Sequence, residues 1–73
     1  MPEVVFRLRD ETIELFKLLK AAGLCDSGGS AKHAVSQGQV EVDGQIETRK
    51  ACQIRCGQQV AYAGNIIRVE QRK

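Results

Sequence analysis

The chain has 73 residues, of which 42% are hydrophobic and 27% are charged, and its formal net charge is +2. A chain of this length buries only about 60% of the surface of its unfolded state, so we expect one small core and a single domain over residues 1–73. No apolar run approaches the roughly 20 residues of a transmembrane helix, and the N-terminus lacks the pattern of a secretory signal. We therefore expect a cytoplasmic protein with no membrane contact.

The first third of the chain predicts a strand followed by a helix. Residues 4–8 favour a strand, because β-branched and aromatic residues are consecutive there. Residues 13–22 favour a helix, because apolar residues recur at a spacing of three or four. Asp10 or Thr12 is the expected cap at its start. Gly23 is the expected end, since glycine adopts at little cost the left-handed conformation that closes a helix.

A second helix is expected to follow after a short connection. Ser27 is a suitable N-cap, the helix is predicted to run to about Gln37, and Gly38 is the expected stop. Its buried face is predicted to consist of three apolar residues, Ala31, Ala34 and Val35.

Beyond Gly38 the pattern of apolar residues changes to a period of two, which indicates strands. Asp43-Gly44 is a strong signal for a type I′ hairpin turn between Val42 and Ile46. Further strands are expected at residues 53–55, 60–62 and 66–69. The sequence therefore predicts an α+β fold in which two short helices pack on a small, mostly antiparallel β-sheet.

The cysteines and the single histidine do not suggest a metal site. Cys25, Cys52 and Cys56 contain no Cys-x-x-Cys pair, and His33 is the only histidine. Four good zinc ligands are therefore not available. Reduced, structural cysteines are the interpretation that we favour, with a functional disulfide as the alternative, and we expect no metal and no cofactor. We also expect no catalysis, because the chain lacks a phosphate-loop signature and a base paired with a nucleophile.

Several residues of the two helices are suited to binding phosphate. The segment Ser27-Gly28-Gly29 offers backbone N–H groups at a helix N-terminus without side chains that shield them. Lys32 follows one turn later, and Lys17 and Lys20 share one face of the first helix. The competing interpretation is a tight turn made by the two glycines and a solvated surface made by the lysines.

A second group of cations follows the hairpin. Arg49 and Lys50 lie in a predicted exposed loop, and Arg55 is expected to share its surface. His33, next to Lys32, is a weaker candidate, since a lone helical histidine is more often an ordinary surface residue. The aromatic residues are too few for binding by stacked bases, namely Phe6, Phe16 and Tyr62. Recognition of shape and phosphate is therefore favoured.

The order of these segments resembles the RNA-binding domain named after small-subunit ribosomal protein S-four, also called the αL motif. In that family Leu-Gly-Leu precedes Ser-x-x-x-Ala-Arg and then Gly-x-Val-x-Val-Asn-Gly. Here residues 22–24 are Ala-Gly-Leu, residues 27–32 are Ser-Gly-Gly-Ser-Ala-Lys, and residues 38–44 are Gly-Gln-Val-Glu-Val-Asp-Gly. The resemblance covers about residues 13–63, with a strand added at each end. The Leu-Leu-Lys, Ser-Gly-Gly-x-Ala-Lys and Arg-Lys segments are similar to those of small stand-alone bacterial members.

The chain also departs from the family pattern. Many members begin the first helix with Arg-Leu-Asp and carry Arg after the capping Ser, whereas this chain has Glu14-Leu15-Phe16 and Gly28. The resemblance implies a protein that binds structured RNA of the ribosomal or transfer RNA class. We expect a monomer. The alternative is a protein–protein interaction module that keeps the same fold and uses Leu24, the hairpin or the terminal strands. The expected RNA-binding residues are Lys17, Lys20, Ser27, Gly28, Gly29, Lys32, His33, Arg49, Lys50 and Arg55.

Overall fold

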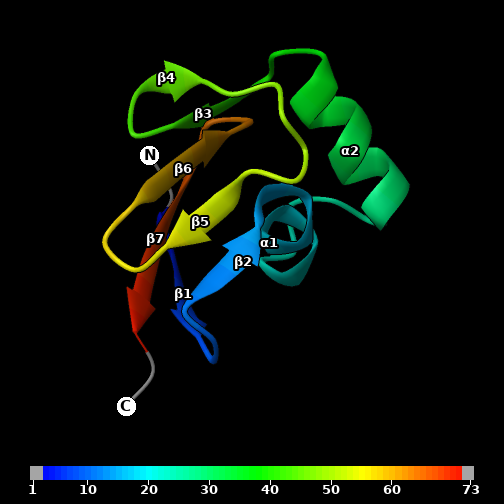
Figure 1. Cartoon of the computed structure of the whole chain (residues 1–73). Helices are drawn as coiled ribbons and strands as arrows, with labels where there is room; N and C mark the ends of the chain where they lie inside the picture. The colour runs from blue at the N-terminus through cyan, green and yellow to red at the C-terminus, as the bar shows by residue number, and fades with distance from the viewer. Residues whose placement is uncertain (1–2, 72–73) are drawn as a thin grey trace.

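Two helices lie against one side of a five-stranded sheet in the computed structural model, which describes residues 3–71 (Figure 1). Within this part of the chain, neither helix is long and apolar enough to cross a membrane. The elements follow in the order β1 (Glu3–Leu8), β2 (Thr12–Glu14), α1 (Leu15–Ala21), α2 (Gly28–Ser36), β3 (Val40–Val42), β4 (Gln45–Ile46), β5 (Gln53–Arg55), β6 (Gln59–Tyr62) and β7 (Asn65–Gln71).

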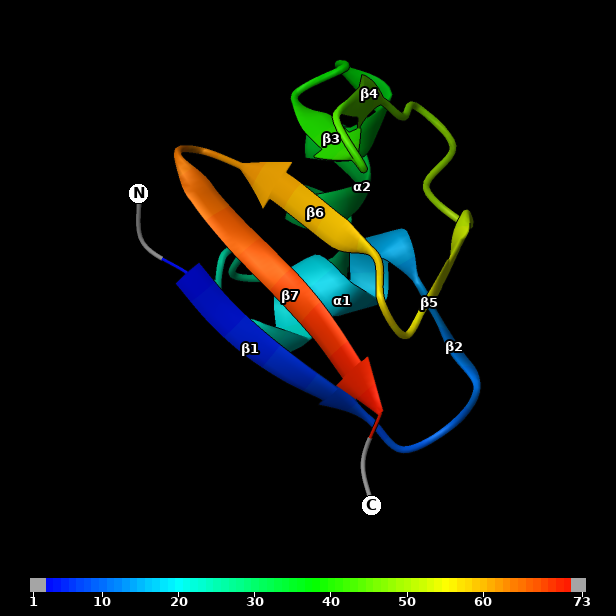
Figure 2. The ribbon, with the colours of Figure 1, turned by 90° about the vertical axis from the view of Figure 1, so that its left-hand side faces the viewer.

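The main sheet has the strand order β1-β7-β6-β3-β4. Strands β1 and β7 are parallel, so the first and the last strand of the described chain lie side by side (Figure 2). The other pairs in this sheet are antiparallel. Strands β2 and β5 form a separate antiparallel ribbon. The predicted α+β fold with a mostly antiparallel sheet is therefore confirmed.

One continuous core joins the helices to the sheet. Leu15, Leu18 and Leu19 of α1 are fully buried, as expected for a helix with one apolar face. The predicted inner face of α2 is also buried, and its small alanines allow α1 to pack closely. The strands complete the core with alternate side chains, namely Leu8, Val40, Ile54, Val60, Ile67 and Val69.

The predicted turn residues and the predicted cap of α2 are confirmed. Gly23 has a φ of +81° directly after α1, and the Ser27 hydroxyl accepts a hydrogen bond from the Ser30 backbone N–H at 3.1 Å. Asp43 and Gly44 both have positive φ, as a type I′ turn requires. These turns and this cap can be predicted from the sequence because each depends only on residues that are close together in the chain.

The predicted start of the first helix is wrong. Ile13 belongs to strand β2, where it pairs with Ile54, and α1 begins at Leu15. Neither of the expected caps is used: the residue at the cap position is Glu14, whose side chain makes no capping bond. The Thr12 hydroxyl instead donates to the Gln53 side-chain carbonyl at 2.7 Å. Pairing with β5 thus draws residues 12–14 out of the helix and also removes β5 from the main sheet.

The two isoleucines of contrasting burial provide a test of this core. Ile54→Ala removes a side chain with no exposed surface, and we expect it to lower the free energy of unfolding by about 2–5 kcal/mol. Ile46→Ala makes the same chemical change at a side chain that is 66% exposed, and we expect a change within about 0.5 kcal/mol. Urea unfolding followed by circular dichroism measures both. Equal losses in the two variants would contradict this assignment of the core.

Candidate nucleic-acid interface

The N-terminal turn of α2 is open to solvent. Ser27 caps it, so one of the first N–H groups, that of Ser30, is already bonded. Gly28 and Gly29 occupy the first turn with ordinary backbone conformations, and a Cβ built at either position meets no atom closer than 3.9 Å. The backbone does not require glycine here. Glycine weakens a helix by about 1 kcal/mol relative to alanine, so the two glycines make this turn less stable. What they provide is a helix start without side chains.

The Phe16 ring links this turn to two lysines. Its atoms lie 4.0 Å from a Cβ built on Gly28, so the ring packs against the start of α2. The Lys32 Nζ lies 4.7 Å from the ring centroid, and the Lys17 Nζ lies 5.9 Å from it. Both distances are within the range of cation–π attraction. The sequence pattern did not indicate the contact between Phe16 and Lys32, because Lys32 belongs to another helix.

A loop from Glu47 to Cys52 is attached to the start of α1 through its backbone. The Leu15 N–H donates to the Cys52 carbonyl at 2.9 Å, and the Phe16 N–H donates to the Lys50 carbonyl at 3.2 Å. These carbonyls replace the missing side-chain cap of α1. As a result, Lys50 is held next to Phe16, although 34 positions separate them in the sequence.

Arg49 is not the free loop cation that the sequence suggested. Its Nε and one terminal nitrogen each donate to a different oxygen of Glu47 at 3.1 Å, and its backbone N–H donates to the same carboxylate. These bonds lower the pKa of Glu47 to about 2 and raise the pKa of Arg49. Lys17 is likewise paired, with Glu14 at 3.1 Å. Both pairs are at the surface, where exchange for another anion costs little.

Beside this loop the surface is hollowed. A groove of about 800 Å³ runs between the loop and the C-terminal end of α2, and its lining includes Ser36, Arg49, Lys50 and Gln53. Arg55 is not part of its lining, although the sequence analysis placed it on this surface.

The remaining predicted residues are exposed but make no link to Phe16. Lys20 and His33 are exposed on α1 and α2, and neither forms an ion pair within residues 3–71. Arg55 is exposed on β5, where its backbone N–H donates to the Gln58 side chain. The structure therefore brings together Gly28, Lys32 and Lys17 around Phe16, with Lys50 attached through the backbone.

The three cysteines are free, and they differ in burial. Cys25 lies in the core, Cys52 is half-buried and Cys56 is exposed. Burial raises the pKa of the Cys52 thiol, and hydrogen bonding with Glu47 raises it further. A protonated thiol is a poor nucleophile and a poor metal ligand. Within residues 3–71, no group of three or more His, Cys, Asp or Glu side chains is arranged to hold a metal ion.

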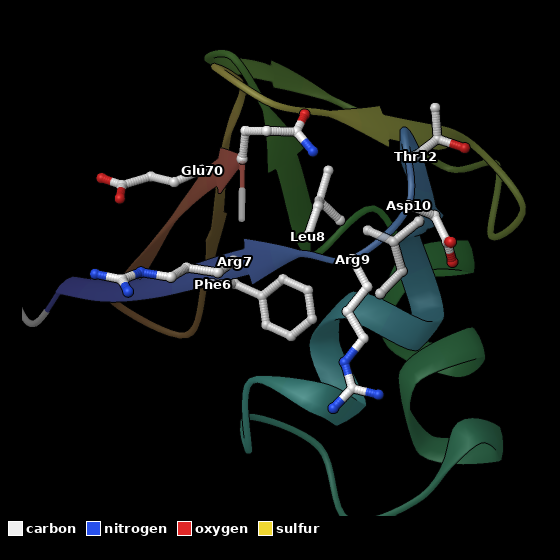
Figure 3. A pocket seen from close by; sticks show the side chains of 9 residues that line it. Phe6, Arg7, Leu8, Arg9, Asp10, Thr12 and Glu70 are labelled. Atoms are coloured by element: carbon white, nitrogen blue, oxygen red, sulfur yellow. The ribbon is translucent and has the colours of Figure 1, made fainter. Parts of the chain in front are cut away.

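A second hollow, of about 950 Å³, lies elsewhere, where β1 and β7 end (Figure 3). Phe6, Leu8 and Ile13 contribute apolar surface to it, and Arg9 and Asp10 contribute charges of opposite sign. None of the predicted RNA-binding residues lines it.

Comparison with known proteins gives a consistent result. The family model for the S4 domain matches residues 6–70. YbcJ of Escherichia coli, provisionally described as an RNA-binding protein, is 51% identical over 57 residues, which cover 78% of this chain and 81% of YbcJ. YbcJ of Shigella flexneri, an uncharacterized protein, matches with the same identity and coverage.

A solved structure is also similar. The solution structure of E. coli YbcJ, described as revealing an αL motif involved in RNA binding, superimposes with a TM-score of 0.65 and 43% sequence identity. The match covers 96% of this chain and 87% of YbcJ. The resemblance to the αL motif read from the sequence is thereby confirmed.

The Arg49–Glu47 pair makes a pH prediction. A carboxylate with a lowered pKa stabilises the folded loop at pH values above its ordinary pKa of 4.5, and this contribution is lost as the pH falls through about 2. Carbon-detected NMR should therefore show Glu47 still ionised at pH 3. In Arg49→Ala its midpoint should move up toward 4.5. A midpoint near 4.5 in the unsubstituted protein would show that the pair does not persist in solution.

Proposed function

The chain belongs to the S4 domain family, and from this premise we propose that it is a small, non-catalytic protein that binds structured RNA through phosphate contacts. The premise rests on the family match over residues 6–70. The description of E. coli YbcJ as an RNA-binding protein supports the same class of ligand for this chain.

The cluster around Phe16 is the observation that carries the proposal. It places a helix N-terminus and two lysines next to one aromatic ring, and the backbone of Lys50 is bonded to the backbone of the same phenylalanine. A helix N-terminus attracts anions through its free N–H groups and the helix dipole. Lysines around it add the charge that binds phosphates of a nucleic-acid backbone. We name the surface of Gly28, Gly29, Lys17, Lys32 and Lys50 around Phe16 the Phe16 surface.

Lys32 is the central cation in this proposal. The Phe16 ring holds its ammonium group by cation–π attraction, and Lys32 forms no ion pair within the described part of the chain. An ammonium group has three N–H donors, so contact with the ring leaves donors for a phosphate oxygen. Lys50 also forms no ion pair within the described part of the chain. Arg49, in contrast, must give up its ion pair with Glu47 before it can bind a phosphate.

The shape of this surface and the family both support a proposal for the kind of RNA. The surface offers cations and backbone N–H groups rather than stacked aromatic rings, which suits contacts to the phosphates and riboses of a folded RNA. We therefore propose ribosomal or transfer RNA as the ligand class, bound in the cytoplasm. The groove beside Lys50 extends the proposed contact toward Arg49 and the end of α2.

Two lysine substitutions test the proposal. Lys32→Ala and Lys50→Ala should each weaken binding to a structured RNA hairpin several-fold at low salt. Each should also reduce the slope of log affinity against log salt by about 0.7–0.9, the amount expected for one lost phosphate contact. Fluorescence anisotropy over a series of salt concentrations measures both quantities.

Arg68→Ala is the matched control. Arg68 is an exposed cation on β7, where its partner is Glu3, and it lies outside the Phe16 surface. Its loss should leave the RNA affinity and the salt slope nearly unchanged. If Arg68→Ala weakened binding as much as Lys32→Ala, binding would depend on net charge alone and the proposed surface would be wrong.

A further inference from the structure

Strand β1 leaves one edge of the main sheet open. It is the terminal strand of that sheet, and within residues 3–71 its backbone pairs only with β7. Val5, in the middle of β1, is 48% exposed, and it is one of two large hydrophobic side chains that are exposed in the described chain. An open edge carries unpaired N–H and C=O groups that can pair with another strand.

The side chains of β1 match a second β1 strand that runs in the opposite direction. Pairing centred on Val5 places Glu3 of one copy opposite Arg7 of the partner subunit, and the two-fold axis repeats this contact. On the other face, Val4 lies opposite Phe6 of the partner subunit, again twice. We propose that β1 pairs antiparallel with β1 of a second copy of this chain to form a symmetric dimer.

Only this register satisfies both faces. Shifting it by two residues places Glu3 or Arg7 opposite Val5 and sets the other charge opposite a position outside β1. Shifting it by one residue would set the outer face of one copy against the inner face of the other. Parallel, in-register pairing would place like charges next to each other, which is unfavourable. The order Glu3-Val5-Arg7 therefore selects one arrangement.

The surroundings of β1 fit the same arrangement. Phe6 and Leu8 line the hollow of about 950 Å³ beside this edge, which provides space next to Phe6 for the partner's Val4. On the outer face Arg7 and Glu70 are register partners, and their side chains extend in the same direction (Figure 3). Glu3 already lies 3.4 Å from Arg68. Across β7 and β1, positive and negative side chains already lie next to each other. A second copy would add one more side chain of opposite charge beside Glu3 and beside Arg7.

The dimer would be weak and would leave the part of the Phe16 surface on α2 free. A contact of one short strand buries an area at the lower end of specific interfaces, so we expect a dissociation constant on the order of 100 μM. Strand β1 lies at the opposite end of the sheet from β3 and β4, beside which α2 lies (Figure 1). The monomer expected from the sequence is then the species found at low concentration.

Mixing two charge variants tests the proposal. Glu3→Arg gives a strand with two arginines, and Arg7→Glu gives one with two glutamates. Each variant alone would place like charges opposite each other at both contacts, so self-association should weaken at least about tenfold. An equimolar mixture restores both opposite-charge contacts in a heterodimer and should regain the association of the unsubstituted protein. Sedimentation equilibrium measures all three samples.

Glu41→Arg is the matched control, because it makes the same charge change at an exposed position on β3. It should associate like the unsubstituted protein. Circular dichroism checks that every variant is folded, and isotope-filtered NMR of the unsubstituted protein should show an intermolecular contact between Val4 and Phe6. A monomer up to about 1 mM, or a mixture that associates no better than its components, would overturn the proposal. Neither result bears on RNA binding, which is measured separately.

Discussion

Two backbone hydrogen bonds at the start of α1 hold the candidate site together. Helix α1 has no side-chain cap, so its first N–H groups need other acceptors. The carbonyls of Cys52 and Lys50 supply them. The same bonds fix the position of Phe16, whose ring then contacts Gly28 and Lys32. A helix start, a loop and a second helix are thus joined at one residue, and the proposed RNA surface depends on that junction.

The distribution of charge explains how a protein with a net charge of only +2 can present a cationic surface. Two cations are held by neighbouring carboxylates, Lys17 by Glu14 and Arg49 by Glu47. Lys32 forms no ion pair within residues 3–71 and is instead held by an aromatic ring. Positions near Phe16 therefore differ in how readily they accept a phosphate. Local arrangement matters more here than the total charge.

Features determined by neighbouring residues could be predicted from the sequence. Gly23, Ser27 and the Asp43-Gly44 turn act through their own backbone geometry, and all were identified correctly. The start of α1 was missed because Ile13 pairs with Ile54, 41 positions away. The contact between Phe16 and Lys32 was missed for the same reason, since it requires the packing of two helices.

The pairing of Arg49 with Glu47 escaped prediction for a different reason. The two residues are close in the sequence, but they lie in an irregular loop, where no helix or strand period indicates which side chains meet. The αL resemblance was read from short motifs and is confirmed by the family match over residues 6–70. The residues that contact RNA and the class of RNA stay predictions. They depend on a complex whose contacts no motif specifies.

The most direct test of the Phe16 surface is an NMR titration of the ¹⁵N-labelled protein with a structured RNA hairpin, performed at low and at high salt. If this surface binds RNA, amide shifts at Phe16, at residues 28–32 and at Lys50 should be large at low salt and much smaller at high salt. Shifts confined to β1 and β7, or shifts that do not change with salt, would contradict it.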